Sequence, residues 1–200
     1  MTDFDGGLWR AESQGIALGL DQSLTAFGIT ALTTTGDLRY YTSVYTPPGK
    51  GVQRLGFIRS WLKGYLKNLD DSFLIEAVAM EDTIRSPHAN TAQMLGELAG
   101  TVKLTIYDHF VAKKHPVDLR TPYRIPPTTL KKYVTEKGNA PKSVMIKGVY
   151  KNWGVDLDDD NAADSFSLAH LISGRASTAV QKDVYTKILR GGEKHKDVIL

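Results

Sequence analysis

Short apolar runs alternate with polar turns through the first half of the chain, a pattern typical of β-strands. The first three runs are joined by short polar segments, which predicts a meander of antiparallel strands. A fourth apolar run follows after a longer interval. The predicted strands are Gly15 to Leu20, Ala26 to Thr33, Leu38 to Tyr45, Phe73 to Met80 and a short last strand over Pro116 to Leu119, with Arg120 to Pro127 as a Pro-interrupted loop.

Other segments carry apolar residues at spacings of three and four, which indicates amphipathic helices with one face toward the core. The clearest extends from Gly51 to Leu69, with Leu55, Ile58 and Leu62 on its apolar side. Further helices are predicted over Ala89 to Phe110, from Pro127 onward, and over Lys142 to Trp153. Another is predicted to end at Ser173, with Asp160 or Asn161 as its N-cap, and one more short helix is expected within Arg175 to Leu200.

The order of these elements predicts one α/β domain built on a five-stranded mixed sheet of order 3-2-1-4-5 flanked by helices. Residues 1–14 are expected to form a flexible tail, 15–175 the domain and 176–200 a C-terminal helix and tail. No window approaches 18 uninterrupted apolar residues, and the acidic start does not resemble a signal peptide, so we expect a soluble protein without a membrane partner. The absence of cysteine excludes disulfides and thiolate chemistry and fits a reducing cytoplasm.

Two predicted strands end on a carboxylate, Asp21 after the first and Glu81 after the fourth. In the predicted order these strands are neighbours, so the two side chains would stand side by side. Asp160, Asn161 and Asp164 share a face at the start of a late helix. Such a cluster of hard oxygen ligands needs divalent cations, and two Mg²⁺ ions would support hydrolysis of a phosphodiester.

The net charge of +3 is unevenly distributed. The segment from Val111 to Lys151 holds ten basic and two acidic residues, a local balance of +8, and an aspartate-rich stretch follows it. A basic surface beside an acidic cluster suits a nuclease, the first for phosphates and the second for metal ions. A solvated pair of lysine-rich helices followed by an acidic loop is an equally open reading.

An ordered set of short motifs resembles the RuvC-type Holliday junction resolvases, which are ribonuclease H-like nucleases. The motifs are Gly19-Leu20-Asp21 with Gly28, Ala79-Met80-Glu81, Ala92 with Leu95-Gly96 and Gly100, Lys131 and Lys142, and Ala162-Ala163-Asp164. The resemblance implies a homodimer that nicks four-way DNA junctions with Mg²⁺ or Mn²⁺ as cofactor. It also implies that Lys131 and Lys142 contact DNA, with Lys132 beside them and Lys142 serving in catalysis as well.

The chain departs from that family in two places, and the first departure resembles the bacteriophage branch, whose members would act in the host cytoplasm. Cellular members carry an aspartate three residues before the last one, where this chain has Asn161, so either Asp160 or Asn161 would be the inner ligand. The loop after Glu81 lacks the family's aromatic wedge. Ile84 is available in its place, and Arg85 and His88 are available for phosphates.

Ala92, Gly96, Ala99 and Gly100 form a small-residue face on one predicted helix, open to a second subunit or to the domain's own sheet. The same carboxylates would also serve a ribonuclease H or transposase-like nuclease. A non-catalytic protein that binds branched DNA is a further alternative, because Asn161 carries no charge. An actin-like or sugar-kinase-like nucleotide binder needs two lobes, and this chain is long enough for one.

Overall fold

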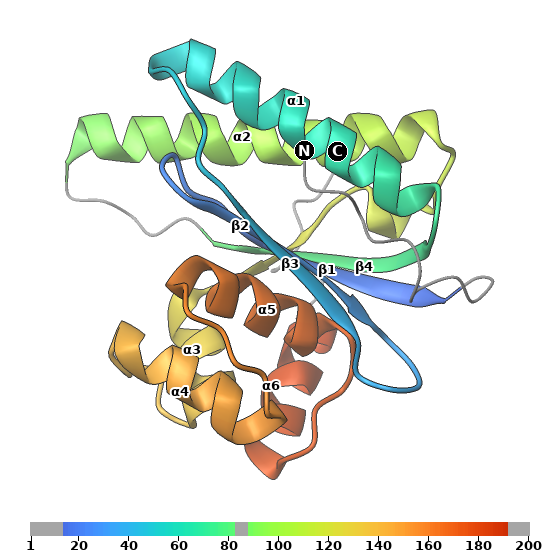
Figure 1. The fold of residues 1–200 in the computed structure, drawn as a ribbon, viewed down its shortest axis with the longest axis vertical. Coiled ribbons are helices and arrows are strands. Elements are labelled where there is room, and N and C mark those ends of the chain that lie inside the picture. The colour runs from blue at the N-terminus through green and yellow to red at the C-terminus, as the bar shows by residue number, and fades with distance from the viewer. Residues whose placement is uncertain (1–13, 83–87, 192–200) are drawn as a thin grey trace.

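A computed structural model describes residues 14–82 and 88–191 and shows a mixed β-sheet between two layers of helices (Figure 1). The sheet has five strands in the order β3-β2-β1-β4-β5, as predicted. β1 pairs antiparallel with β2 and β2 with β3, whereas β1 and β4, and β4 and β5, run parallel. The strands are β1 Gly15–Asp21, β2 Phe27–Thr33, β3 Tyr40–Tyr45, β4 Leu74–Glu81 and β5 Tyr123–Ile125.

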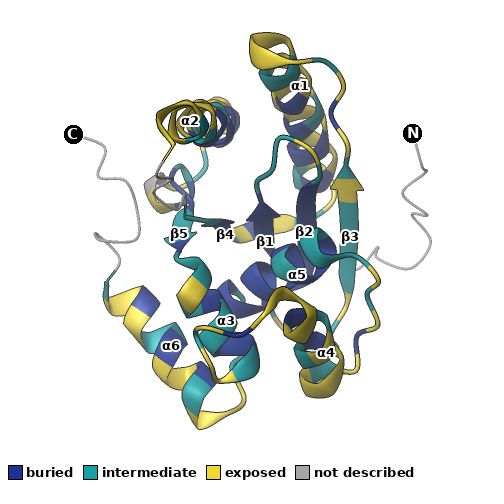
Figure 2. Cartoon of the chain, turned by 90° about the vertical axis from the view of Figure 1, so that its left-hand side faces the viewer, coloured by how far each residue is buried: buried dark blue, intermediate teal, exposed yellow. Residues whose placement is uncertain are grey.

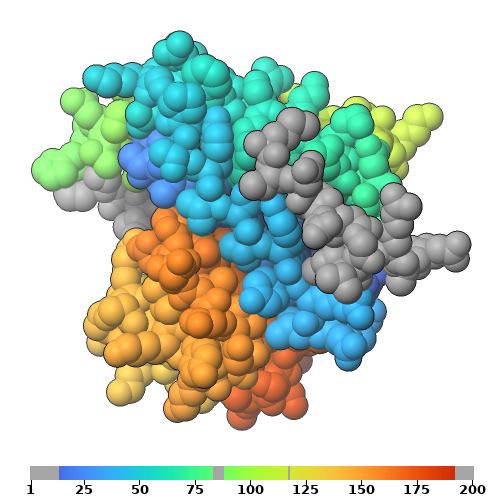
Figure 3. All heavy atoms as spheres, viewed as in Figure 1, coloured from blue at the N-terminus to red at the C-terminus, as the bar shows by residue number. Residues whose placement is uncertain are grey.

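Helices α1 and α2 cover one face of the sheet, and α3 to α6 lie on the other (Figures 1 and 2). Their bounds are α1 Gly51–Asp70, α2 Ala89–Ala112, α3 Pro127–Thr135, α4 Lys142–Trp153, α5 Asp160–Ile172 and α6 Ala179–Arg190. Side chains of β3 and α5 meet along the side of the molecule shown in Figure 3. No helix in the described part of the chain is both long and apolar enough to cross a membrane.

Each face of the sheet carries its own hydrophobic core. Leu18 and Leu20 of β1 pack with α1 and α2, whereas Ala17 of the same strand packs with the helices of the opposite layer. Every residue of β1 and β2 is buried, which explains why these strands read as continuous apolar runs and not as alternating ones.

A β-bulge interrupts the pairing of β1 with β4. Ile16 pairs with Ile75 and Ala17 with Ala77, so Glu76 is an extra residue on β4. Ile75 faces the core beneath α1 and α2, and after the bulge Val78 and Met80 face that same core.

Two local predictions are wrong. The last strand is Tyr123–Ile125 and not Pro116 to Leu119, where residues Val117–Leu119 form one turn of 3-10 helix. Prolines on both sides leave only three residues to pair with β4, too few for an apolar alternation to be visible. The N-cap of α5 is Asp159, whose carboxylate accepts hydrogen bonds from the backbone N–H groups of residues 161 and 162.

Candidate active site

Asp21 and Glu81 lie next to each other at the ends of parallel neighbours. Leu20 pairs with Met80, so the following residues, Asp21 and Glu81, are adjacent across the same ladder. Leu20 and Met80 face the α1 and α2 core, so alternation turns both carboxylates toward the opposite face, where α5 lies. The two carboxyl groups are close enough that each acts on the pKa of the other.

Two glycines bring α5 against these strand ends. A Cβ atom on Gly19 would lie 2.1 Å from the carbonyl oxygen of Ser165, and one on Gly28 would lie 2.3 Å from that of Asn161. Only residues without side chains allow this approach. A 2.9 Å hydrogen bond between the hydroxyls of Thr30 and Ser165 fixes the same contact. The close packing carries Asp164, one residue before Ser165, to the two strand-end carboxylates.

Burial raises the pKa of all three acids, and the negative charge of a neighbouring acid adds to the effect at each. The pKa of Asp21 rises to about 8, first through burial and then through the charges of Glu81 and Asp164. Burial and the charge of Asp164 raise the pKa of Glu81 to about 7. Burial raises the pKa of Asp164 to about 6, against the opposing charges of Lys142 and Lys131. The three carboxyl groups therefore form one electrostatically coupled cluster that lacks sufficient positive charge.

The donor set of this cluster fits a hard divalent cation. Asp21, Glu81 and Asp164 offer carboxylate oxygens from three different elements, and a cation between them would offset both their burial and their repulsion. Across residues 14–82 and 88–191, however, no three acidic or histidine side chains converge as a ready-made coordination shell. The carboxylates would have to turn toward the ion as it binds.

Gln22 is a further polar residue at this site, and the sequence pattern did not single it out. Its Nε2 atom donates a 3.0 Å hydrogen bond to the backbone oxygen of Glu81 and so ties the end of β1 to the end of β4. Its Oε1 atom is buried and has no hydrogen-bond partner within the described residues. Gln22 thus fixes the spacing of the two strand ends that carry Asp21 and Glu81.

Asp160 and Asn161 lie at the first turn of α5, on the solvent side of the cluster. The ammonium group of Lys142 lies 3.0 Å from Oδ2 of Asp160, and this interaction lowers the pKa of Asp160. The side-chain amide of Asn161 donates to the carboxylates of Asp159 and Asp160, at 3.2 Å each. Both residues therefore take part in a local network at the helix start.

The structure separates the predicted DNA-contacting residues into two groups. The charges of Lys131 and Lys142 both lower the pKa values of Glu81 and Asp164, so both lysines face the acidic cluster. Lys132, in contrast, lies 3.7 Å from Asp183 of α6. His88 is exposed at the N-cap of α2. Arg85 and Ile84 lie outside the described residues.

Comparison with known proteins gives matches at the level of structure. No protein-family model and no curated protein sequence matches the chain. RuvC from Thermus thermophilus, solved in complex with a Holliday junction substrate, superposes with a TM-score of 0.64 at 18% identity, over 86% of this chain and 95% of that one. A second structure of Thermus thermophilus RuvC superposes with a TM-score of 0.60 at 17% identity, over 90% of this chain and 98% of that one.

The yeast mitochondrial Holliday junction resolvase Ydc2 is also similar, with a TM-score of 0.54 at 12% identity, over 91% of this chain and 87% of that one. Identities this low establish the fold and leave the activity to be argued from the site. The sheet order, the flanking helices and these three superpositions together show that the chain has the ribonuclease H-like fold of the RuvC-type resolvases.

Proposed function

We propose that this protein is a metal-dependent endonuclease that cleaves branched DNA, with the four-way junction as its main substrate. The observation that carries the proposal is that Asp21, Glu81 and Asp164 lie in one electrostatic cluster with two lysines, on a fold shared with Holliday junction resolvases. Buried acids next to exposed cations suit a reaction in which metal ions and a phosphodiester meet at one point.

Asp21, Glu81 and Asp164 would hold the metal, with Asp160 or Asn161 completing the set from the solvent side. Two Mg²⁺ ions, or Mn²⁺ in their place, supply an activated water and stabilise the leaving oxygen when bound. Gln22 fixes the spacing of the strand ends through its hydrogen bond to Glu81. Lys142 is placed to hold the phosphate that is cut, because its ammonium group lies at the rim of the acidic cluster.

The substrate path follows the basic segment that contains α3 and α4. Lys131 on α3 and Lys142 at the first residue of α4 both act electrostatically on the acidic cluster from outside it. Neutralisation of phosphates by such lysines gives strong, salt-dependent binding that does not depend on DNA sequence. The DNA backbone would therefore pass between these two side chains.

A homodimer would present two such sites to the two symmetric strands of a junction. The outer side of α2 provides an apolar surface for this contact. Leu104 is 59% exposed, and Tyr107 and Val111 follow it at helical spacing. One and two turns earlier, a Cβ on Gly100 or Gly96 would meet open space. We expect the native mass to be twice 22.1 kDa and Gly96→Leu to reduce it to one chain, as measured by light scattering after gel filtration.

The decisive experiment incubates the protein with end-labelled four-way, three-way and linear duplex DNA, with and without Mg²⁺. We expect paired nicks at the branch point of the four-way substrate only when Mg²⁺ is present. Asp21→Asn under the same conditions controls for contaminating nucleases. Tight junction binding without cleavage at any Mg²⁺ or Mn²⁺ concentration would instead identify a non-catalytic junction-binding protein.

A further inference from the structure

A pocket with several charged lining residues lies outside the candidate active site. It has a volume of about 300 Å³ and lies between α1, from Arg59 onward, and the C-terminal half of α2 with its cap residue Lys113. None of the residues that line the pocket belongs to the candidate active site. The pocket is lined by Arg59, Lys63, Lys67, Thr105, Asp108, His109, Ala112 and Lys113.

Four of the eight lining residues are permanent cations, against one carboxylate. Arg59, Lys63 and Lys67 follow one another at intervals of four residues, so they share one side of α1. Arg59 lies 3.4 Å from Asp108 with both side chains more than half exposed, a pairing that contributes little in water. Lys63 has no ion-pair partner within the described part of the chain.

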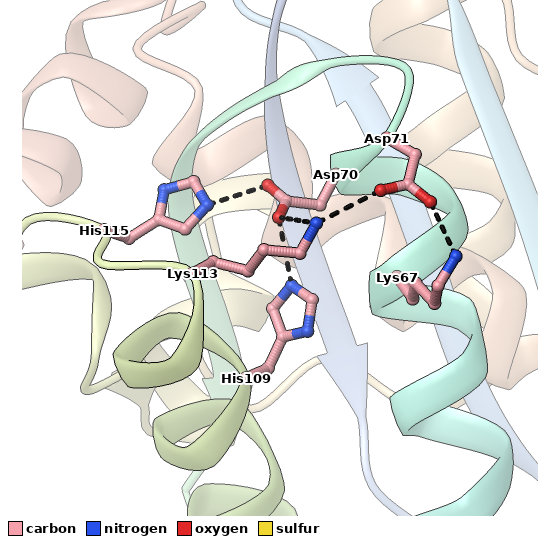
Figure 4. Close-up of polar contacts among 6 residues, drawn as sticks. All are labelled: Lys67, Asp70, Asp71, His109, Lys113 and His115. Atoms are coloured by element: carbon pink, nitrogen blue, oxygen red, sulfur yellow. Dashed lines mark hydrogen bonds and ion pairs between the residues drawn. The ribbon is translucent and has the colours of Figure 1, made fainter.

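A network of charges holds the remaining cations at the rim, as Figure 4 shows. The carboxylate of Asp71 lies 2.8 Å from the Lys67 ammonium and 3.1 Å from that of Lys113. Asp71 therefore keeps two like charges from different helices close together. These contacts are exposed, so a doubly charged anion can compete with Asp71 for both lysines.

Beneath the rim, His109 is a buried polar group that faces the pocket. Its side chain is 6% exposed, and its Nε2 atom lies 3.3 Å from Oδ2 of Asp70 without the alignment of a hydrogen bond. Asp70 is itself buried and is also contacted by His115, at 2.8 Å. The hydroxyl of Thr105 donates to the backbone oxygen of Thr101 and can still accept a hydrogen bond.

We propose that this pocket between α1 and α2 binds a phosphate group. Cations from two helices surround it, and its volume matches a single phosphate with an attached small group. The same chemistry is offered by free or nucleotide-borne phosphate and by the backbone of a DNA arm that extends away from the junction. Neither source involves the carboxylate cluster, so the pocket is separate from the proposed nuclease reaction.

The test uses the full-length protein and Lys63→Glu, with Lys182→Glu as the matched control. Lys182 is exposed on α6 and does not line the pocket. Inorganic phosphate is titrated at constant ionic strength while the backbone amide signals of Thr105, His109 and Lys113 are followed by NMR. We expect saturable shifts at these residues and binding about tenfold weaker in Lys63→Glu, with no change in Lys182→Glu. Arg59→Glu gives a second variant should the first fail to fold.

A second arm of the experiment uses a four-way junction in EDTA, so that binding is measured without cleavage. If DNA is the source of the phosphate, Lys63→Glu lowers the slope of log affinity against log salt by about 0.9, and inorganic phosphate alone has little effect. The proposal is overturned if neither probe shifts the pocket signals, or if Lys63→Glu and Lys182→Glu behave alike. Metal-dependent cleavage by the wild type, measured in parallel, keeps this outcome separate from the proposed nuclease activity.

Discussion

The Nζ atom of Lys142 and the Oδ2 atom of Asp160 lie 3.0 Å apart and join the first residue of α4 to the first residue of α5. Both side chains are partly exposed, at 70% and 42%, so the pair is worth about 1 kcal/mol or less. A DNA phosphate can therefore replace Asp160 at little cost. The ion pair keeps Lys142 beside the acidic cluster.

Lys142→Ala is expected to lower both affinity and rate. The slope of log affinity against log salt should fall by about 0.9, because one phosphate contact is lost. Single-turnover cleavage at saturating DNA should also slow, since the scissile phosphate is no longer held. Lys182→Ala serves as the control. An unchanged slope together with an unchanged rate would place the DNA elsewhere.

Asp160→Ala is expected to reduce cleavage more than Asn161→Ala. Neither residue is the N-cap of α5, because Asp159 has that role. The two variants should therefore have similar thermal stability, which makes their activities directly comparable. Asp160 contributes a charge and positions Lys142, whereas the Asn161 amide is engaged with its neighbours. Greater loss from Asn161→Ala in a Mg²⁺ titration would make Asn161 the inner ligand.

Asp21→Asn, Glu81→Gln and Asp164→Asn should each lower cleavage by several orders of magnitude and leave junction binding intact or tighter. Glu76→Gln, on the same strand as Glu81 and exposed, is the control. Near-native turnover in any of the three variants would refute the site.

Without metal, Asp21→Asn should also raise the melting temperature at pH 7. The folded-state pKa of Asp21 is raised to about 8, so stability is lost as pH rises from 3.8 toward that value. Asparagine does not titrate, so the variant does not lose stability in this way. The wild-type protein in EDTA is the reference.

Gly28→Ala should lower the free energy of unfolding by about 1 to 3 kcal/mol, because the new Cβ meets a backbone oxygen that cannot rotate away. Cleavage should fall as well, since α5 must move off the strand ends. Gly64→Ala on α1 is the matched control. It adds a methyl group into open space and should be neutral or stabilising by up to about 1 kcal/mol. Urea denaturation of both variants measures the contrast.

His170 should make the protein less stable in mild acid. Burial lowers its pKa from 6.5 to about 3, with the charge of Arg175 adding to the effect. Between those values the unfolded chain binds a proton that the folded chain does not, so stability falls as pH falls from 6.5 toward 3. Within this range the free energy of unfolding falls by up to about 1.4 kcal/mol for each pH unit. His170→Gln should lack this component in urea titrations at pH 7, 6 and 5, whereas equal slopes would show that His170 titrates normally.

The sheet order could be predicted from the succession of apolar runs, and the acidic strand ends could be predicted because two of these runs stop at a carboxylate. The helix over Lys142–Trp153 was predicted to the residue, since Pro141 precedes it and glycine follows it. The N-cap of α5 was not predicted correctly, because three consecutive aspartates offer equivalent side chains and only the backbone path selects Asp159.

Other features depend on contacts that no local pattern encodes. The hydrogen bond from Gln22 to Glu81 joins residues 59 positions apart. The pocket between α1 and α2 depends on how two helices are placed on the sheet. Gly19 and Gly28 did carry a signal, because glycine within a buried strand often marks a close backbone approach.

The bulge at Glu76 sets the phase of β4, and with it the face of the sheet on which Glu81 lies. If β4 paired with β1 without the extra residue and Ile75 kept its present place, Val78 and Met80 would face α5. Glu81 would then face α1 and α2, away from Asp164. Deleting Glu76 would restore a regular ladder and leave Glu81 where it is. Inserting a residue between Glu76 and Glu81 would reverse that side chain unless a second bulge formed. The acidic cluster thus tolerates shortening of β4 at one point and opposes lengthening beyond it.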